Sequence, residues 1–443
     1  MDGLIFLLLG SVLFVLLGAL AVRLALLPMK DFRHVYYASR CVIQHHDPYD
    51  HGCLLRGYEA DEGSLPSDPA VSHGLRLVLS LCTNLPTALF VVAPFAVLPW
   101  KLAEAIWLVL VAAFYLLASF LTWNLAAKYS PRVAGALIFL LLAGSELLLL
   151  SGNAAGLVVA LCAIAVWCFL RERWVLAGMV CLALGLAIKP HDAGLIWLYF
   201  LLAGGVHRKR ALQTLALTVA LAVPAVLWVS HSAPHWPQEL HSNLATATAP
   251  GGRDDPGPAT GGGRGLEMIV SLQAAVSLLR DDPHFYNPVV YAICGAPLIV
   301  WGFKTLRAGF AQNTAWFALA AAAALSMLPV YHRTYDARLL LLTVPACAML
   351  WIEGGPIAWC ALLLNTAGIL LTGDLLWIVL FQLTGYSPRS VTIGMVPAPL
   401  ILLALGLFYL WVYVGRGLSP AAVPEVEGDR RPGPFRVEPS PIK

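Results

Sequence analysis

Long apolar runs separated by short polar connections make up most of this chain. Runs of about 17–25 apolar residues have the length that a helix needs to cross a bilayer. Candidate spans cover residues 3–27, 84–99, 102–126, 133–150, 153–170, 174–188, 191–206, 211–229, 287–303, 311–329, 339–353, 356–381 and 394–414. No strand-like alternation suggests a barrel. The pattern predicts an all-α polytopic membrane protein with roughly 11–13 transmembrane helices.

Composition agrees with this prediction. Of the 443 residues, 59% are hydrophobic and only 12% are charged, whereas a soluble domain carries about 25% charged residues. The net charge of +3 gives no reason to expect a nucleic-acid partner. The first span is expected to be a retained anchor and not a cleaved signal peptide, because it lacks a basic leading region and its apolar run is too long.

Basic residues predict which helix ends face the cytoplasm. They gather at 171–173, 207–210, 304–307 and after Arg416. The polar segments 189–192, 230–286 and 331–336, together with the loop that follows the first span, are then expected to share the opposite, outer face. One inconsistency remains. Four spans between residues 84 and 170 would place the basic residues 171–173 on the same side as the loop after the first span, whereas basic residues are expected on the cytoplasmic side. The interrupted segment 133–150 is expected to be re-entrant.

The loops and the tail complete the predicted organisation. Residues 1–416 are expected to form one membrane domain, and 28–83 its first extracytoplasmic loop. Within that loop, residues 32–43 carry an apolar stripe that predicts a helix lying in the membrane interface. Cys41 and Cys53 could pair there if the loop faces an oxidising compartment. The Pro- and Gly-rich loop 230–286 is expected to be mobile, and the Pro-rich tail 417–443 to be disordered and cytoplasmic.

Asp31, directly after the first span, is the first candidate for chemistry. A carboxylate at a membrane boundary can act as a general base toward the headgroup of a lipid-borne substrate. The alternative is a solvated helix-end charge that pairs with Lys30 or Arg33.

Two further polar clusters interrupt the apolar pattern. Lys189, followed by Pro190, His191 and Asp192, could hold a phosphate as a point charge, or could simply reach the lipid headgroups. The segment 331–338 supplies cations and phenols suited to phosphate and sugar, although any outer loop can contain such residues. The cations are His332, Arg333 and Arg338, and the phenols include Tyr335.

Other motifs are missing or weak. The chain has no phosphate-binding P-loop, dinucleotide fingerprint or zinc-protease motif, so nucleotide use is not expected. The histidines at 231, 235 and 241 match no strong zinc spacing. No cofactor is predicted; a divalent metal is possible but not indicated, because a cationic clamp around a phosphate does the same electrostatic work.

Several short motifs, taken in order, resemble glycosyltransferase family 87. They are Asp31-Phe32, Tyr36-Tyr37-Ala38-Ser39, Asp47-Pro48-Tyr49, Asn84-Leu85-Pro86, Ala93-Pro94, Leu98-Pro99, Gly152-Asn153, Lys189-Pro190, and His332 with Tyr335. The resemblance covers most of residues 1–350. Two departures, Gly152-Asn153 in place of the frequent Gly-Gln and the single proline at 86, weaken any assignment of sugar specificity.

The resemblance implies a GT-C-like helical bundle with an extracytoplasmic active site. It implies inverting transfer of a hexose or pentose, mannose above all, from a polyprenyl-phosphate sugar to a lipid or glycan acceptor, with Asp31 as the base. The donor phosphate would contact Lys189, His332, Arg333 and Arg338. The substrates would contact Tyr36, Tyr37, His191 and Tyr335.

A transporter or flippase of a lipid-linked or small solute is the alternative. Transporters carry charges near the bilayer midplane and often show internal repeats. Here the polar clusters collect at span ends on one predicted face and no repeat is evident, which favours an enzyme. The expected location is the bacterial plasma membrane.

Overall fold

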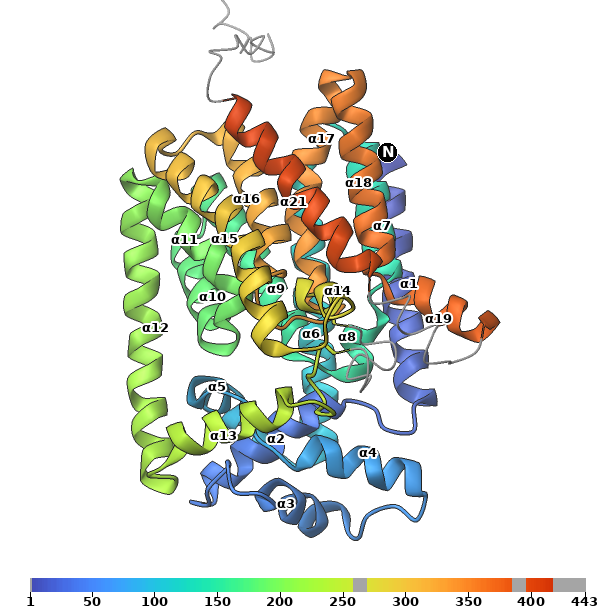
Figure 1. The fold of residues 1–443 in the computed structure, drawn as a ribbon, viewed down its shortest axis with the longest axis vertical. Coiled ribbons are helices and arrows are strands. Elements are labelled where there is room, and N and C mark those ends of the chain that lie inside the picture. Colours follow the sequence, from blue (N-terminus) through green and yellow to red (C-terminus); the bar gives the residue numbers. More distant parts are fainter. Residues whose placement is uncertain (1, 258–268, 385–395, 417–443) are drawn as a thin grey trace, which may run out of the picture.

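The computed structural model describes residues 2–257, 269–384 and 396–416, and within them the chain is helical (Figure 1). In these ranges the isolated bridge between Ile269 and Arg333 stands outside any strand. The helices are α1 (Asp2–Leu24), α2 (Lys30–Ile43), α3 (Cys53–Glu62), α4 (Pro69–Leu79), α5 (Pro86–Ala96), α6 (Trp100–Ala126), α7 (Pro131–Ala143), α8 (Glu146–Ser151), α9 (Ala154–Arg171), α10 (Val175–Ile188), α11 (Pro190–Ala203), α12 (Gly205–Ser232), α13 (Trp236–Thr248), α14 (Leu272–Val276), α15 (Pro283–Ala308), α16 (Gln312–Ser326), the 3₁₀ helix η1 (Asp336–Thr343), α17 (Val344–Glu353), α18 (Gly355–Leu371), α19 (Asp374–Thr384) and α21 (Pro397–Arg416). The predicted all-α polytopic fold is confirmed.

The number of long apolar helices is smaller than the sequence suggested. Among the described residues, six helices are long and apolar enough to cross a membrane, or seven if the pair α18 and α19, bent by 60°, counts as one span. Several of the other expected spans are divided into shorter pieces. Residues 133–150 break at Gly144 into α7 and α8, and residues 339–353 begin as the 3₁₀ helix η1 before α17. A run of apolar residues predicts burial in lipid or protein, and it does not show where a helix is interrupted.

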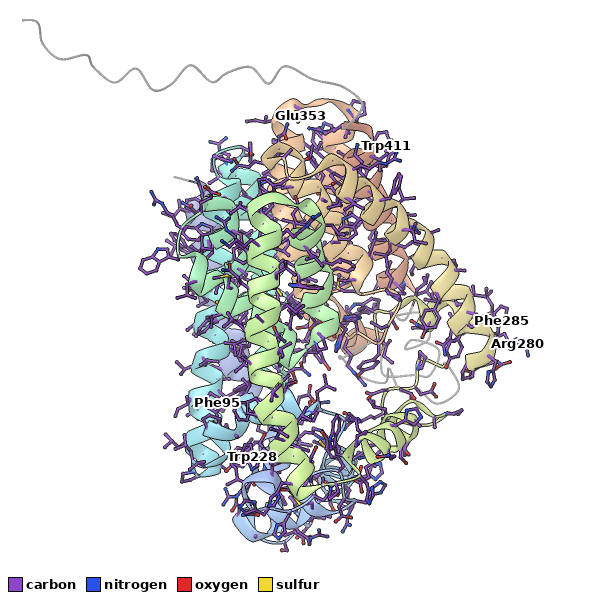
Figure 2. The ribbon with its side chains drawn as sticks, turned by 90° about the vertical axis from the view of Figure 1, so that its left-hand side faces the viewer. Phe95, Trp228, Arg280, Phe285, Glu353 and Trp411 are labelled. Atoms are coloured by element: carbon purple, nitrogen blue, oxygen red, sulfur yellow. A yellow bond between two sulfur atoms is a disulfide. The ribbon has the colours of Figure 1, made fainter. Side chains whose placement is uncertain are left out.

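The helices form a tall upper bundle above a lower layer (Figure 1). The lower layer contains α2, α3, α4, α5 and α13. Figure 2 shows α12 running the length of the molecule into this layer, with Trp228 near its lower part and Glu353 at the opposite, upper end. The polar segments identified from the sequence come together where the bundle meets the lower layer.

The packing of α1 against α7 resolves the topology of residues 84–170. Gly3 faces Pro131, Gly10 faces Phe139, and Gly18 faces Leu149. The two helices therefore run in the same direction and begin at the same end of the molecule. The close approach requires small residues, as in tightly packed membrane helices.

It follows that α6 returns the chain to the end where α1 began. The segment that does not cross is therefore 84–99, which forms the short helix α5 beside α2 (Figure 1). The expectation that 133–150 was the exception is wrong, because α7 starts at the same end as α1 and is parallel to it. An apolar run of this length fits either a span or a covered surface helix.

The lower layer is built around α2, whose polar side is covered by protein and is not exposed to water. Arg33 forms an ion pair with Glu62 of α3, and Arg40 pairs with Asp61 at 2.9 Å. Cys41 and Cys53 are joined by a disulfide that links α2 to α3. The predicted helix is present, but α3 and not water lies over Arg33 and Tyr37, both of which are buried.

The loop 230–286 crosses the lower layer through α13 and is tied to it by polar contacts. Asn243 donates hydrogen bonds to the carbonyls of Tyr49 and Cys82, each at 3.1 Å. Arg253 donates to Thr83 Oγ1 at 2.6 Å. The mobility expected for this loop stays a prediction. The tail 417–443 lies outside the described residues.

Candidate active site

Lys189 lies at the junction of α10 and α11, where Pro190 begins the second helix. Its ammonium forms an ion pair with Asp336 and lies 3.3 Å from Asp192 Oδ2. Burial disfavours the charged form, but the carboxylates of Asp192 and Asp336 outweigh it and raise the pKa of Lys189. One ammonium therefore serves two buried carboxylates.

His332 completes this cluster from the segment between α16 and η1. The imidazole is fully buried, and its Nε2 lies 3.0 Å from Asp192 Oδ1. Its Nδ1 lies 2.9 Å from the carbonyl oxygen of Val330, which fixes the ring orientation. Burial lowers the pKa of His332, but the contact with Asp192 has the larger combined effect and raises it above the ordinary value.

His191, one residue after Pro190, faces the same point and is partly exposed. Its Nε2 lies 3.9 Å from Asp192 Oδ1, and its ring centroid lies 5.0 Å from that of His332. The two imidazoles and the Asp192 carboxylate thus surround a common position at the N-terminal end of α11.

Asp336 and Tyr335 hold the 331–336 segment against α10 and α11. Asp336 Oδ2 accepts a hydrogen bond from the backbone N–H of Arg333 at 2.8 Å, while Oδ1 binds Lys189. The Lys189 ammonium also lies 5.4 Å from the centre of the Tyr335 ring, within cation–π range. Segments far apart in the sequence are therefore fastened at one point.

Asp31 lies in the first turn of α2. It is positioned by the tip between α8 and α9, which consists of Gly152 and Asn153. Asn153 Nδ2 donates to Asp31 Oδ2 at 2.7 Å, while Asn153 Oδ1 caps α9 by accepting from the N–H of Ala155 at 2.8 Å. The backbone N–H of Met29 donates to the Leu150 carbonyl at 2.6 Å. Asp31 is thus fixed to α9, and Arg33, one of the alternative partners expected from the sequence, pairs with Glu62 instead.

The tip itself requires glycine at position 152. Gly152 has a φ of +63°, and a Cβ there would lie 2.9 Å from the side chains of Met29 and Phe32. Its carbonyl accepts from Trp107 Nε1 at 2.9 Å. Only a residue without a side chain allows α2 to approach this closely.

Asp31 contributes to the electrostatic surroundings of Tyr335. Burial, followed by the charges of Tyr331 and Asp31, raises the pKa of Tyr335 well above its ordinary value. The charge of Asp31 thus contributes at Tyr335, whose ring lies within cation–π range of Lys189. Asp31, Tyr335, Lys189, His191 and His332 form one candidate site.

Arg333 lies at the edge of this site. Its guanidinium hydrogen-bonds Tyr331, lies 3.2 Å from Asp254 Oδ1 and donates to the carbonyl of Arg253 at 2.6 Å. Tyr331 OH also donates to Asp254 at 2.7 Å. These contacts fasten the loop 230–286 beside the cluster.

Arg338 lies in a separate buried network. It donates to Asp374 Oδ1 at 2.9 Å and to the Thr372 carbonyl at 3.0 Å. Asp374 Oδ2 accepts from the N–H of Leu147 at 3.0 Å. The guanidinium thus joins the bend between α18 and α19 to the start of α8.

Tyr36 and Tyr37 pack within the lower layer. Tyr36 OH donates to the Leu98 carbonyl at 2.7 Å, and Tyr37 OH donates to Glu62 Oε1 at 3.1 Å. Both rings pack against Trp100. The structure does not bring them to the Lys189 cluster.

Three residues of the site had no assigned role in the sequence prediction. Asp192 and Asp336 were noted only as members of their motifs, and Asn153 as part of a short Gly-Asn signal. A carboxylate between apolar helices is costly unless it is paired. The position of Asp192 and Asp336 between apolar segments was therefore the sequence signal of a function. The partner of Asn153, 122 positions away, could not be inferred.

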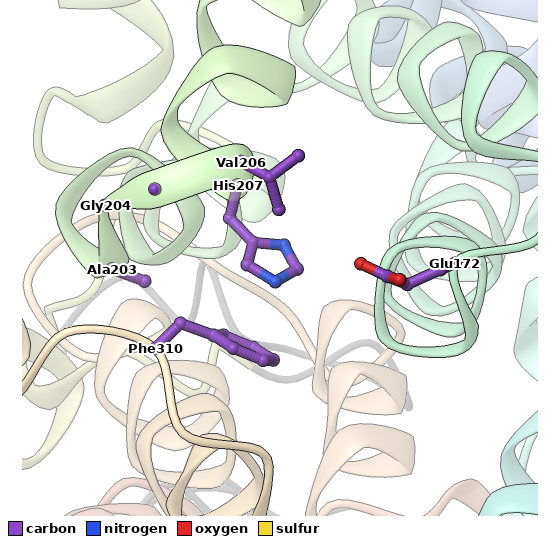
Figure 3. Close-up of a pocket in the computed structure, with 7 residues that line it drawn as sticks. Glu172, Ala203, Gly204, Val206, His207 and Phe310 are labelled. Atoms are coloured by element: carbon purple, nitrogen blue, oxygen red, sulfur yellow. The ribbon is translucent and has the colours of Figure 1, made fainter.

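The hollow in Figure 3 lies at the other end of α11. It is lined by Glu172, Ala203, Gly204, Gly205, Val206, His207 and Phe310, with the His207 ring between Phe310 and Glu172. α11 separates it from Lys189 by its full length. None of the predicted site residues lines this hollow.

The fold and the site define an all-α, polytopic membrane protein with charged side chains gathered at one end of its upper helices. Residues 83–280, slightly less than half the chain, match the model of glycosyltransferase family 87. This match confirms the resemblance inferred from the motifs, because residues 83–280 are similar to glycosyltransferase family 87, a family of membrane glycosyltransferases. Asn153 and Lys189 lie inside the matched segment, whereas Asp31 and His332 lie outside it. Neither a curated protein nor a solved structure matches the chain.

Proposed function

We propose that this protein transfers a hexose or pentose, mannose above all, from a polyprenyl-phosphate sugar to a lipid or glycan acceptor on the extracytoplasmic face of the membrane. The observation that carries the proposal is the position of Asp31. This carboxylate is held by Asn153 at 2.7 Å, and its charge contributes at Tyr335, whose ring lies within cation–π range of Lys189. A base and a set of cations are the two groups that this transfer needs.

Asp31 is the proposed general base. The acceptor hydroxyl gives its proton to the Asp31 carboxylate while its oxygen bonds to the anomeric carbon. The bond between that carbon and the donor phosphate oxygen breaks, and polyprenyl phosphate leaves. A single displacement inverts the anomeric configuration. The bond from Asn153 keeps one carboxylate oxygen engaged and so orients the other.

The phosphate side of the reaction is assigned to Lys189 and His332. Negative charge grows on the leaving phosphate, and preorganised positive groups stabilise it. Arg333 lies at the margin, where it fastens the neighbouring loop. Arg338 is engaged with Asp374 and is better explained as a structural residue. His191 and Tyr335 border the same position and are the proposed sugar contacts, whereas Tyr36 and Tyr37 would support α2.

The orientation in the membrane follows from charge and from the disulfide. The helix ends at residues 171–175, 203–210 and 304–312 are rich in Arg and Lys, as expected for a cytoplasmic face. The Cys41–Cys53 disulfide lies in the lower layer, and disulfides persist in oxidising compartments. Both indications support an extracytoplasmic site, a cytoplasmic tail and location in a bacterial plasma membrane.

The test is sugar transfer by purified protein from a radiolabelled polyprenyl-phosphate mannose to membrane lipid extract. Asp31→Asn keeps the shape and the contact with Asn153 but removes the base, so we expect transfer to fall by about 10²–10⁴-fold. Asp50→Asn is the matched control, because Asp50 is an exposed acid of the same loop whose carboxylate pairs with Arg56. Equal activity of Asp31→Asn and wild type would exclude the base role. Absence of transfer from any polyprenyl-phosphate sugar would exclude the donor class.

A further inference from the structure

The Lys189 cluster is short of positive charge for a site that must attract a phosphate. The Lys189 ammonium contacts both Asp192 and Asp336, and all of these groups are largely buried. Two carboxylates thus face one lysine ammonium, and the imidazole of His332 lies beside them. Buried charge is costly unless it is paired. The residues around Lys189 thus favour an additional cation over an anion.

Three ligand atoms converge beside Lys189 with spacing that suits a metal ion. One ligand atom each of His191, Asp192 and His332 lie within 4.8 Å of one another. The Asp192 oxygen Oδ1 lies 3.0 Å from His332 Nε2 and 3.9 Å from His191 Nε2. A tetrahedral zinc ion with bonds of about 2.0–2.1 Å places its ligand atoms roughly 3.3 Å apart. The separation from His191 is too long for a hydrogen bond and close to that value.

The orientation of His332 also fits a metal ligand. Its Nδ1 lies 2.9 Å from the Val330 carbonyl, the contact that commonly fixes a metal-bound imidazole. Nε2 then faces Asp192, with Oδ1 at 3.0 Å. Within the part of the chain that the structure describes, this fully buried Nε2 has no regular hydrogen-bond partner. A second proton on the ring could fill the same place, but it would leave the role of His191 unexplained.

We infer that His191, Asp192 and His332 form a three-ligand site for a divalent transition metal of the zinc class, with an open coordination position. Two imidazoles and one carboxylate suit zinc, whereas magnesium and calcium prefer oxygen ligands. The bound ion would add two positive charges to the cluster. A single phosphodiester carries one negative charge and would complement it. This last step, in which a phosphate oxygen of the donor takes the open position, rests on the proposed function.

Metal binding can be measured without any sugar transfer. Untagged protein is purified in detergent, stripped with a chelator and titrated with Zn²⁺ or Co²⁺ alone, and bound metal is measured by mass spectrometry. We expect about one equivalent to bind, with the visible absorption of a tetrahedral cobalt ion. His191→Ala should weaken binding at least tenfold. His191 is partly exposed, so the fold tolerates its loss, and His284→Ala, at an exposed position of α15, is the matched control.

The outcomes separate this inference from the proposed function. Absence of stoichiometric metal, or equal affinity of His191→Ala and wild type, would overturn the metal site even if sugar transfer is observed. Metal binding lost in His191→Ala and kept in His284→Ala would support the site even if no sugar is transferred. Full transfer activity in protein stripped of metal would overturn the phosphate-binding role of the ion.

Discussion

Arg338 and Lys189 are both buried cations at the ends of helices in the upper bundle, yet their surroundings differ. Arg338 faces one carboxylate, Asp374, and also donates to a backbone carbonyl at 3.0 Å. Lys189 faces two carboxylates and lies beside an imidazole nitrogen that lacks a regular partner. The first arrangement pairs one cation with one anion, although Arg338 Nε has no hydrogen-bond partner among the described residues, whereas the second places two carboxylates around one cation.

This difference separates a structural ion pair from a binding site. Asp374 also accepts from the Leu147 N–H, so the Arg338 network connects η1, α8 and the bend after α18. The carboxylates around Lys189 exceed its charge, and His191 adds a further, partly exposed nitrogen. Buried charges that are not balanced, as in the Lys189 cluster, lower the stability of the fold. They are typical of functional sites.

The largest effect is expected when one partner of the structural pair is removed. Asp374→Asn leaves the Arg338 guanidinium buried without its counter-ion, and the free energy of unfolding should fall by about 3–5 kcal/mol. Denaturant or thermal unfolding in detergent measures this loss. Asp50→Asn, at an exposed position, should change it by less than about 0.5 kcal/mol.

A double variant checks the cause of that loss. Replacing the pair by apolar residues, as in Arg338→Met with Asp374→Leu, removes both buried charges and should recover much of the lost stability. If Asp374→Asn were as stable as the wild type, the assignment of Arg338 to a structural role would be wrong.

A smaller effect is expected from the equivalent change in the Lys189 cluster. Asp336→Asn leaves Lys189 paired with Asp192, and the new amide oxygen can still accept from the Arg333 N–H. The free energy of unfolding should fall by less than about 3 kcal/mol, the upper range for one hydrogen bond to a charged group. A loss as large as that of Asp374→Asn, in the same unfolding assay, would show that both clusters serve stability alike.

The sequence predicted the parts of this fold that depend on local pattern. Apolar runs located the helices, and basic residues predicted which helix ends face the cytoplasm. An 11-residue apolar helix has the same composition whether it lies in a bilayer or beside α2. The placement of residues 84–99 could therefore not be predicted from the sequence. This placement depends on contacts with α2, which are far away in the sequence.

For the site, too, the sequence predicted what depends on local pattern and not what depends on contacts between distant segments. The motifs containing Asp31, Lys189 and His332 were identifiable as polar interruptions in apolar sequence. Arg333 and Arg338, by contrast, lie five positions apart in one motif and looked equivalent. Their directions are set by the start of the 3₁₀ helix η1 at Asp336, so that one faces Asp254 and the other Asp374. No local signal distinguishes them.

The smallest effect is expected at the contact that fastens loop 230–286 next to the Lys189 cluster. Tyr331→Phe removes the hydroxyl that bonds Asp254 at 2.7 Å and that accepts from Arg333, while the ring remains in place. The Arg333–Asp254 contact at 3.2 Å persists, so the free energy of unfolding should fall by only about 1 kcal/mol. Hydrogen exchange at residues 249–257 should become faster, because these residues are held through Asp254. Exchange around Leu147, next to the Arg338 pair, should stay unchanged, and a rise in both places would mean that the two clusters are coupled and do not have the separate roles assigned to them.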